Sequence, residues 1–160
     1  MFPSTQTGGV SQRANPAPVS CGPTTDQRAW PLQSIQDAFD ALQTNGVLPK
    51  NQRPAAGTRY YPRQYGSGSR APTNVAVVNA LNAIPECVTG QANMKYFEFP
   101  LTDPVFTDGP PQSQGPDRVV AISANIGQGG TRSFTYCLAM THRGGTGPDD
   151  PTFRPCTNAP

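Results

Sequence analysis

The chain has 160 residues, the size of one domain, and it contains 16 glycines and 19 prolines, about a fifth of the total against a usual share of roughly 12%. Charged residues are 14% and the formal net charge is +2. These values exclude a coiled coil, a helical bundle and a charge-rich disordered chain, and no apolar run approaches the ~20 residues of a membrane span. They predict a small, loop-rich protein dominated by strands.

The first predicted element is a helix that follows an unstructured start. Residues 1–20 are rich in Ser, Thr, Gln, Gly and Pro, which predicts a flexible arm before a single domain over residues 21–157. Four apolar side chains then recur at helical spacing: Leu32, Ile35, Phe39 and Leu42. Pro31 suits a first turn and Gly46 suits a helix end, so the pattern predicts a helix over residues 31–45.

The middle of the chain carries a weaker pattern. Residues 60–65 are rich in tyrosine and predict the end of a strand, and the Gly-Ser-Gly-Ser run at 66–69 predicts a loop. Residues 73–84 mix valines, which favour a strand, with alanines and a leucine, which favour a helix. We interpret this stretch as a short helix that begins at Thr73 or Asn74.

The second half of the chain has an apolar period of two. Three strands are predicted there, over residues 96–101, 118–122 and 134–140, with loops of proline and glycine between them, and residues 152–156 predict a final short strand. The fold class that follows is α+β, with one α-helix packed on a central antiparallel sheet.

The cysteines indicate disulfides and not a metal site. Cys21, Cys87, Cys137 and Cys156 form no Cys-x-x-Cys pair and the chain has one histidine, so a structural zinc site is not expected. Four widely spaced cysteines predict two disulfides, for which three connectivities exist. Disulfides are typical of oxidising compartments, and we expect a processed, secreted protein although the first ten residues lack the apolar core of a signal peptide.

The predicted strands each present one polar group of chemical interest: Glu98, Arg118 and, just after the third, His142. On strands of period two these groups can converge on one face, where they can cleave a phosphodiester by general acid–base chemistry. Each also has a plain structural explanation. Glu98 suits the exposed side of an amphipathic strand, Arg118 suits a surface or structural ion pair with Asp117, and His142 suits a solvent-facing or hydrogen-bonded position beside a glycine-rich loop.

The order of five motifs distinguishes these explanations. The motifs are Tyr61-Pro62-x-x-Tyr65, Tyr96-x-Glu98-Phe99-Pro100-Leu101, Gly115-Pro116-Asp117-Arg118-Val119-Val120, Thr141-His142-x-Gly144 and Phe153-x-x-Cys156. In this order, over about residues 20–157, the chain resembles the fungal guanyl-specific ribonuclease N/T family, which includes purine-preferring members and ribotoxins such as sarcin. The motifs are most similar to those of the purine-preferring branch. The resemblance implies the microbial ribonuclease fold.

The resemblance also implies residue roles. Glu98 would be the general base that takes the ribose 2′-hydroxyl proton, and His142 the general acid that protonates the departing 5′-oxygen. Arg118 would stabilise charge on the phosphorus centre, Tyr61 would hydrogen-bond a phosphate oxygen, and Phe153 would form an apolar wall. The reaction needs neither metal nor cofactor, and it leaves a 2′,3′-cyclic phosphate and a 5′-hydroxyl end.

Two positions depart from the family pattern. Arg63 stands where the family usually has a histidine; it can steady an ionised Glu98 but cannot accept a proton, so we expect reduced or pH-shifted activity. The base-recognition loop lacks the carboxylate that bonds guanine. The backbone amides of Gly66 and Ser67 and a stacking Tyr65 are then the expected base contacts, and purine preference is expected to be relaxed.

By the same resemblance, Cys21 pairs with Cys156 and Cys87 pairs with Cys137. Residues 70–90 are longer than the family pattern and predict an added element near the substrate edge.

Three functions stay open from the sequence. The first is a secreted, monomeric endoribonuclease that acts on single-stranded RNA and binds no membrane. The second is a non-catalytic RNA- or protein-binding module, such as a fungal effector delivered into a host cell to meet host RNA. The third is a ribotoxin that nicks one ribosomal RNA loop; two lysines and a net charge of +2 argue against it, because ribosome docking favours lysine-rich loops.

Overall fold

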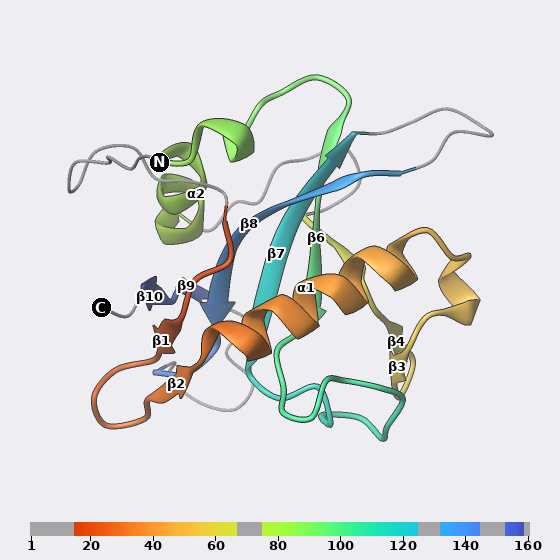
Figure 1. Cartoon of the computed structure of the whole chain (residues 1–160), viewed down its shortest axis with the longest axis horizontal. Coiled ribbons are helices and arrows are strands. Elements are labelled where there is room, and N and C mark those ends of the chain that lie inside the picture. Colours follow the sequence, from red (N-terminus) through yellow and green to blue (C-terminus); the bar gives the residue numbers. More distant parts are fainter. Residues whose placement is uncertain (1–14, 67–74, 125–131, 145–152, 159–160) are drawn as a thin grey trace.

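A five-stranded antiparallel sheet organises the molecule, in the strand order β5-β6-β7-β8-β9 (Figure 1). The computed structural model describes residues 15–66, 75–124, 132–144 and 153–158. The strands of this sheet are β5 (Arg63–Tyr65), β6 (Met94–Pro100), β7 (Asp117–Ala124), β8 (Phe134–Thr141) and β9 (Arg154–Pro155). The α+β fold class is therefore confirmed at this level, with a sheet built from the predicted strands.

Shorter elements surround the central sheet. A second sheet joins the two ends of the domain in the order β10 (Thr157–Asn158), β1 (Val19–Cys21) and β2 (Arg28–Trp30). The hairpin of β3 (Ala55–Ala56) and β4 (Arg59–Tyr60) leads into β5. The helices are α1 (Leu32–Gly46) and α2 (Val75–Asn82), and the 3-10 turns are η1 (Lys50–Gln52) and η2 (Pro85–Cys87).

Helix α1 lies across one face of the sheet (Figure 1) and begins and ends within one residue of its predicted bounds. Its buried stripe includes Ile35, Ala38 and Leu42, as the helical spacing predicted. Gly46 is the last residue of the helix and lies against the Phe134 ring, which a Cβ at that position would overlap. Packing against the sheet therefore requires the glycine, in addition to its poor helix propensity.

Helix α2 packs against the opposite face of the sheet, over β8 and β9. The helical interpretation of residues 73–84 is confirmed for Val75–Asn82, whereas the proposed start at Thr73 or Asn74 lies outside the described residues. The description of the domain as one helix on a sheet was incomplete. Val77 and Leu81 are completely buried, so α2 forms a second helical layer on the sheet and contributes to its core.

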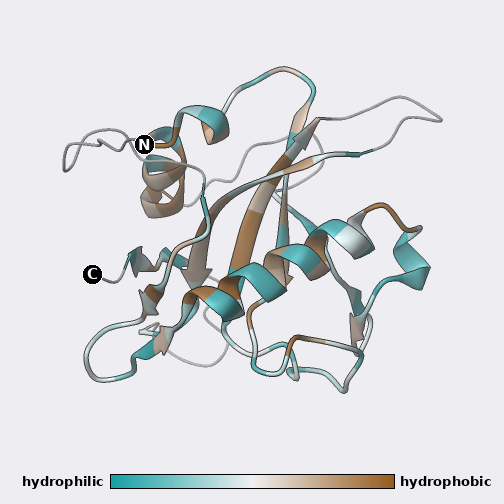
Figure 2. Ribbon diagram, viewed as in Figure 1, coloured by the Kyte–Doolittle hydropathy of each residue, from teal (hydrophilic) through white to brown (hydrophobic). Residues whose placement is uncertain are grey.

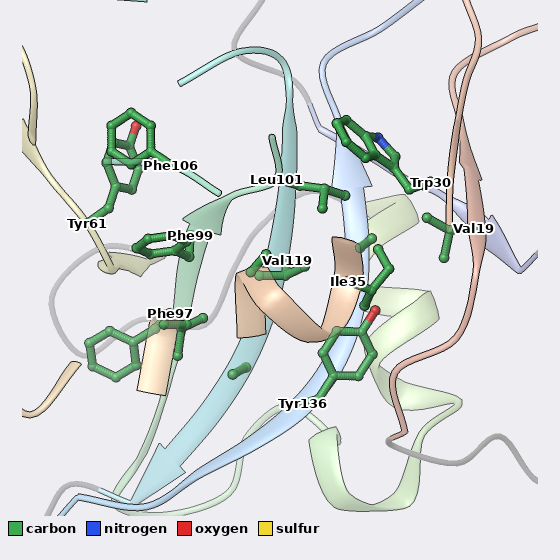
Figure 3. Close-up of a cluster of buried hydrophobic side chains, with 14 of the residues drawn as sticks. Val19, Trp30, Ile35, Tyr61, Phe97, Phe99, Leu101, Phe106, Val119 and Tyr136 are labelled. Atoms are coloured by element: carbon green, nitrogen blue, oxygen red, sulfur yellow. The ribbon is translucent and has the colours of Figure 1, made fainter. Parts of the chain in front are cut away.

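Two apolar clusters fill the two sides of the sheet. Figure 3 shows part of the larger one, between α1 and the sheet, where Phe97, Phe99 and Val119 face the helix. The smaller cluster lies under α2. Figure 2 shows the matching pattern, with hydrophobic colouring concentrated along β7 and β8. A core on both faces makes the central strands almost entirely buried.

An irregularity in β8 exchanges its two faces. Val120 is paired with Leu138, but its neighbour Ala121 is paired with Tyr136, so Cys137 is an extra residue. Tyr136 therefore packs edge-on against Phe39 of α1, with ring centroids 5.6 Å apart, while Leu138 belongs to the cluster under α2.

The two disulfides have the predicted connectivity. Cys21–Cys156 joins β1 to the end of the domain, and Cys87–Cys137 joins η2 to the extra residue of β8. Each bridge links segments far apart in the chain, with sequence separations of 135 and 50 residues.

The ordered domain begins slightly before residue 21. Val19 is buried and Ser20 is paired with Thr157, so both belong to β1 although the sequence placed them in the arm. The pattern of residues 1–20 missed this strand because its partners lie at the opposite end of the chain. Residues 1–14 lie outside the described part.

Candidate active site

Four polar side chains of interest belong to one face of the central sheet. Arg63 in β5 is the register partner of Glu98 in β6. Arg118 lies two residues along β7 from the register partner of Glu98, and His142 lies two residues beyond Met140, the partner of Arg118. Because partners share a face and side chains alternate with a period of two, the sheet gathers all four on the face that α2 partly covers.

A buried ion pair occupies the centre of this face. Arg118 Nε donates to Glu98 Oε1 at 3.1 Å, and the two side chains are 3% and 8% exposed. The Arg118 Nη1 group also donates to three carbonyls, those of Gln114 and Gly115 in the turn before β7 and that of Asp117, the first residue of β7. The guanidinium is thereby held in place, and within the described residues its Nη2 group makes no hydrogen bond.

Burial and charge act on Glu98 in opposite directions. Burial raises the pKa of Glu98, and the positive charges of Arg118, Arg63 and Arg59 and the Arg118 hydrogen bond lower it, with a net upward shift from 4.5. A carboxylate with a raised pKa is a stronger base than an exposed one, and the group stays protonated up to a higher pH.

Aromatic rings frame the ion pair. The Arg118 guanidinium lies 5.5 Å from the ring centroid of Tyr61 and 5.8 Å from that of Phe153. The His142 ring lies on Phe153 with centroids 3.6 Å apart and planes 30° apart, and Tyr65 meets Phe153 edge-on at 5.9 Å. Phe153 thus lies between the His142 imidazole and the Arg118 guanidinium. The pKa of Tyr65 is raised, mainly by burial and next by the negative charge of Glu98.

Tyr61 is placed differently from its expected role. The residue has 0% exposure and packs edge-on against Phe106, with centroids 5.8 Å apart. In this arrangement its ring supports Arg118 from the core side and does not present itself at the surface.

Asp117 is the partner that the sequence misassigned. Arg118 and Asp117 do not form the surface or structural ion pair that the sequence suggested: Arg118 pairs with Glu98, and Asp117, with 0% exposure, binds Trp30 and Arg143. Trp30 Nε1 donates to Asp117 Oδ2 at 3.0 Å, and Arg143 Nε donates to Oδ1 at 3.1 Å. Two ion pairs, Glu98–Arg118 and Asp117–Arg143, therefore lie next to each other where the sequence suggested one.

The Asp117 cluster holds the segment that carries His142. Arg143 follows His142 directly, reaches Asp26 as well at 3.0 Å, and its backbone N–H donates to the Thr141 hydroxyl. The His142 N–H donates to the Pro116 carbonyl, one residue before Asp117. Burial lowers the pKa of Arg143, but the hydrogen bonds and charges of Asp117 and Asp26 outweigh burial and raise it. The sequence analysis missed these residues, because nothing local marks a partner 26 or 117 positions away.

The expected base-recognition loop is described only at its start. Gly66 is half-buried and has a φ of 102°, a left-handed conformation that favours glycine, whereas Ser67 lies outside the described residues. Phe153 is 9% exposed and Tyr65 is half-buried, so both rings line the same side of the sheet as Glu98.

A basic pocket of about 520 Å³ opens at the outer edge of β5. Nine residues line this edge pocket: Lys50, Arg53, Thr58, Arg59, Tyr60, Pro62, Arg63, Gln64 and Phe97. Among these nine residues, Arg63 is the one for which the sequence predicted a role in the reaction.

Within residues 15–66, 75–124, 132–144 and 153–158, no cluster of three or more His, Cys, Asp or Glu side chains is arranged to hold a metal ion. No helix of the described part is long and apolar enough to cross a membrane.

The chain matches no family model, no curated protein and no solved structure. Membership of the ribonuclease N/T family therefore stays a prediction from the motifs.

Proposed function

We propose that this protein is an endoribonuclease that cleaves single-stranded RNA by acid–base transfer of the phosphate to the neighbouring 2′-oxygen. The observation that carries the proposal is the buried Glu98–Arg118 pair, bordered by Phe153, on which His142 stacks. A carboxylate, a guanidinium and an imidazole, brought together from three separate strands or strand ends, are the groups that this reaction needs.

Each group has one step in the reaction. The Glu98 carboxylate takes the proton of the ribose 2′-hydroxyl, and the 2′-oxygen attacks phosphorus. The bond from phosphorus to the 5′-oxygen breaks, and the leaving oxygen takes a proton from the His142 imidazolium. Arg118, held by three carbonyls, stabilises the negative charge that develops on the phosphoryl oxygens. The products are a 2′,3′-cyclic phosphate and a 5′-hydroxyl.

Arg63 affects the pKa of Glu98, the general base in this scheme. Its charge, like those of Arg118 and Arg59, lowers the pKa of Glu98 and so offsets part of the effect of burial. An arginine cannot take the proton itself, so Glu98 is the base and Arg63 its electrostatic support. The cleavage rate should then follow the ionisation of one carboxylate.

Tyr65, Gly66 and Ser67 form the proposed base site, and Phe153 is the apolar wall beside the phosphate. Tyr65 offers aromatic surface next to Phe153, and the sequence that follows it, Gly66 and Ser67, has backbone amides that can bond a base. Stacking tolerates every base, so we propose a purine preference that is relaxed and not a strict guanine requirement.

We also propose that the enzyme is secreted and monomeric and needs no cofactor. Two disulfides are typical of proteins that fold in an oxidising compartment, which supports this location. Host RNA or ribosomal RNA would be reached after delivery into a host cell.

A second candidate is an RNA-binding module without catalysis. The observation in its favour is that Glu98 is 6% exposed and already paired with Arg118, and that Arg63 takes the position of the family histidine. Under this alternative, the same face binds RNA but no proton is transferred.

Incubation with homopolymeric RNAs, total RNA and intact ribosomes separates the candidates. We expect general degradation with 2′,3′-cyclic phosphate ends, lost in Glu98→Gln and His142→Ala and retained in Arg28→Gln, a surface change on β2. Binding by the wild type without cleavage would favour the second candidate. A single ribosomal RNA fragment would instead indicate a ribotoxin.

A further inference from the structure

The edge pocket adjoins the candidate active site. Arg63 lines the pocket and is also the register partner of Glu98. Arg59, another lining residue, is close enough to Glu98 for its charge to lower the pKa of that carboxyl. The pocket and the catalytic face therefore share β5 as a common wall, and one extended ligand can contact both.

Positive charge is concentrated in this pocket. Four of its nine lining residues are cations and none is an acid: Lys50, Arg53, Arg59 and Arg63. Within the described part of the chain, no carboxylate lies within ion-pair distance of any of the four. Like charges that lie together without a directly paired carboxylate repel one another, so an anion in the pocket is favoured.

Arg132 adds a fifth charge behind the pocket. Its guanidinium lies 5.0 Å from the ring centroid of Phe97, a lining residue, and its Nη1 atom is buried with no hydrogen-bond partner among the residues that the structure describes. Burial, and next the charge of Arg132, lowers the pKa of Arg53. A buried unpaired guanidinium nitrogen is costly, which is a second indication that an anion belongs nearby.

The floor of the pocket is rigid and its rim is exposed. Arg53 donates to the carbonyls of Leu48 at 3.0 Å, Pro62 at 2.8 Å and Gly46 at 3.3 Å, so its guanidinium joins the end of α1 to the start of β5. Lys50 and Arg59 are exposed around it and can point at a ligand. A fixed cation with adjustable neighbours is a preorganised anion site.

We propose that the edge pocket is a second phosphate subsite, which binds a backbone phosphate of RNA away from the bond that is cleaved. The choice of RNA as the polyanion rests on the proposed function, because Arg63 and Arg59 join the pocket to Glu98. Arginine forks match phosphate oxygens, and Tyr60 in the lining offers a ring on which a base can stack. The subsite would make long RNA a better substrate than a dinucleotide.

Binding can be measured apart from cleavage. A short 2′-deoxyoligonucleotide lacks the attacking hydroxyl, so its affinity is read by fluorescence anisotropy at several salt concentrations without turnover. Lys50→Gln and Arg59→Gln should each weaken binding about five- to tenfold and make the slope of log K against log salt shallower by about 0.7. Arg28→Gln, which removes an exposed arginine from β2, is the matched control and should leave affinity and slope near the wild-type values.

The results distinguish failure of the subsite from failure of the proposed function. If the wild type cleaves RNA but both pocket variants bind like Arg28→Gln, the subsite is wrong and the enzyme stands. If the wild type cleaves no RNA but the pocket variants lose affinity, the subsite stands without the enzyme. Polyglutamate of matched length that competes as well as the oligonucleotide would show a general anion surface and overturn the phosphate assignment.

Discussion

The buried pair of Asp117 and Arg143 should contribute more to stability than any exposed contact of the same arginine. Arg143 makes two ion pairs that differ in burial: Asp26 is 56% exposed, and Asp117 is 0% exposed. An exposed pair is worth at most about 1 kcal/mol, whereas breaking a buried pair by removing one partner costs about 3–5 kcal/mol. Arg143→Gln leaves the carboxylate of Asp117 with the Trp30 indole as its remaining side-chain donor among the described residues.

We expect Arg143→Gln to lower the free energy of unfolding by about 3 kcal/mol, since glutamine can retain one hydrogen bond. For a protein of this size, that change corresponds to a melting temperature lower by about 6–12 °C. Urea unfolding followed by circular dichroism measures the free energy directly, and an unchanged m-value shows that the folded and unfolded states keep their compactness.

A double-mutant cycle isolates the pair. Asp117→Asn removes the buried charge, so combining it with Arg143→Gln should cost about 2 kcal/mol less than the sum of the two single changes. Asp26→Asn tests the exposed partner and should cost less than about 1 kcal/mol. The reasoning is refuted if Arg143→Gln costs no more than Asp26→Asn, or if the two changes at the buried pair are additive.

Three further predictions concern the site and the disulfides. Burial raises the pKa of Glu98 above its unfolded value, so the folded chain holds the proton more tightly and stability falls as pH rises from about 4.5 through the raised value. Glu98→Gln should therefore gain melting temperature relative to the wild type as pH increases, and a constant difference across that range would contradict it. Arg63→His restores a group that can share the base proton, so the cleavage rate or its pH optimum should change; an unchanged pH–rate profile counts against the role of Arg63. Replacing both Cys87 and Cys137 by alanine opens a bridge with a sequence separation of 50 residues and should cost about 4 kcal/mol in urea unfolding; a loss under 1 kcal/mol would mean that the unfolded chain is not constrained by this bridge.

The elements that the sequence predicted well are the long ones, in which a local pattern of apolar side chains extends over several residues. Helix α1 has apolar side chains at every turn, and β6, β7 and β8 are seven or eight residues long and rich in apolar and aromatic side chains, so each pattern is long enough to be recognised. Strands β1, β2 and β10 are two or three residues long and were missed. Their pairing joins the two ends of the domain, and no local pattern records a partner at the far end of the chain.

The faces of β8 show the same limit within a single strand. Phe134, Tyr136, Leu138 and Met140 alternate regularly in the sequence, which predicts one shared face. The extra residue at Cys137 divides them, with Phe134 and Tyr136 toward α1 and Leu138 and Met140 toward α2. A bulge depends on the pairing with β7, so alternation within β8 cannot reveal it.

The sequence predicted which residues form the candidate site but not which of them pair with one another. The motifs placed Glu98, Arg118, His142 and Phe153 together, and the structure brings all four to one face of the sheet. The partner of Arg118, the burial of Tyr61 and the Asp117 cluster came as new information.

The glycine and proline content, weak charge and four cysteines of this chain indicated a small domain with long loops and two disulfides, and the periods of its apolar side chains indicated the α+β class. The spacing of apolar side chains also predicted the longer helix and strands, because that pattern lies within a few neighbouring positions. Only the tertiary structure decided which buried charges pair, that a second helix covers the sheet, and that cations from separate turns form the edge pocket. The physical reason is that electrostatic pairing depends on distance and burial in space, and Trp30 and Asp117, 87 positions apart, share a hydrogen bond that no local pattern records.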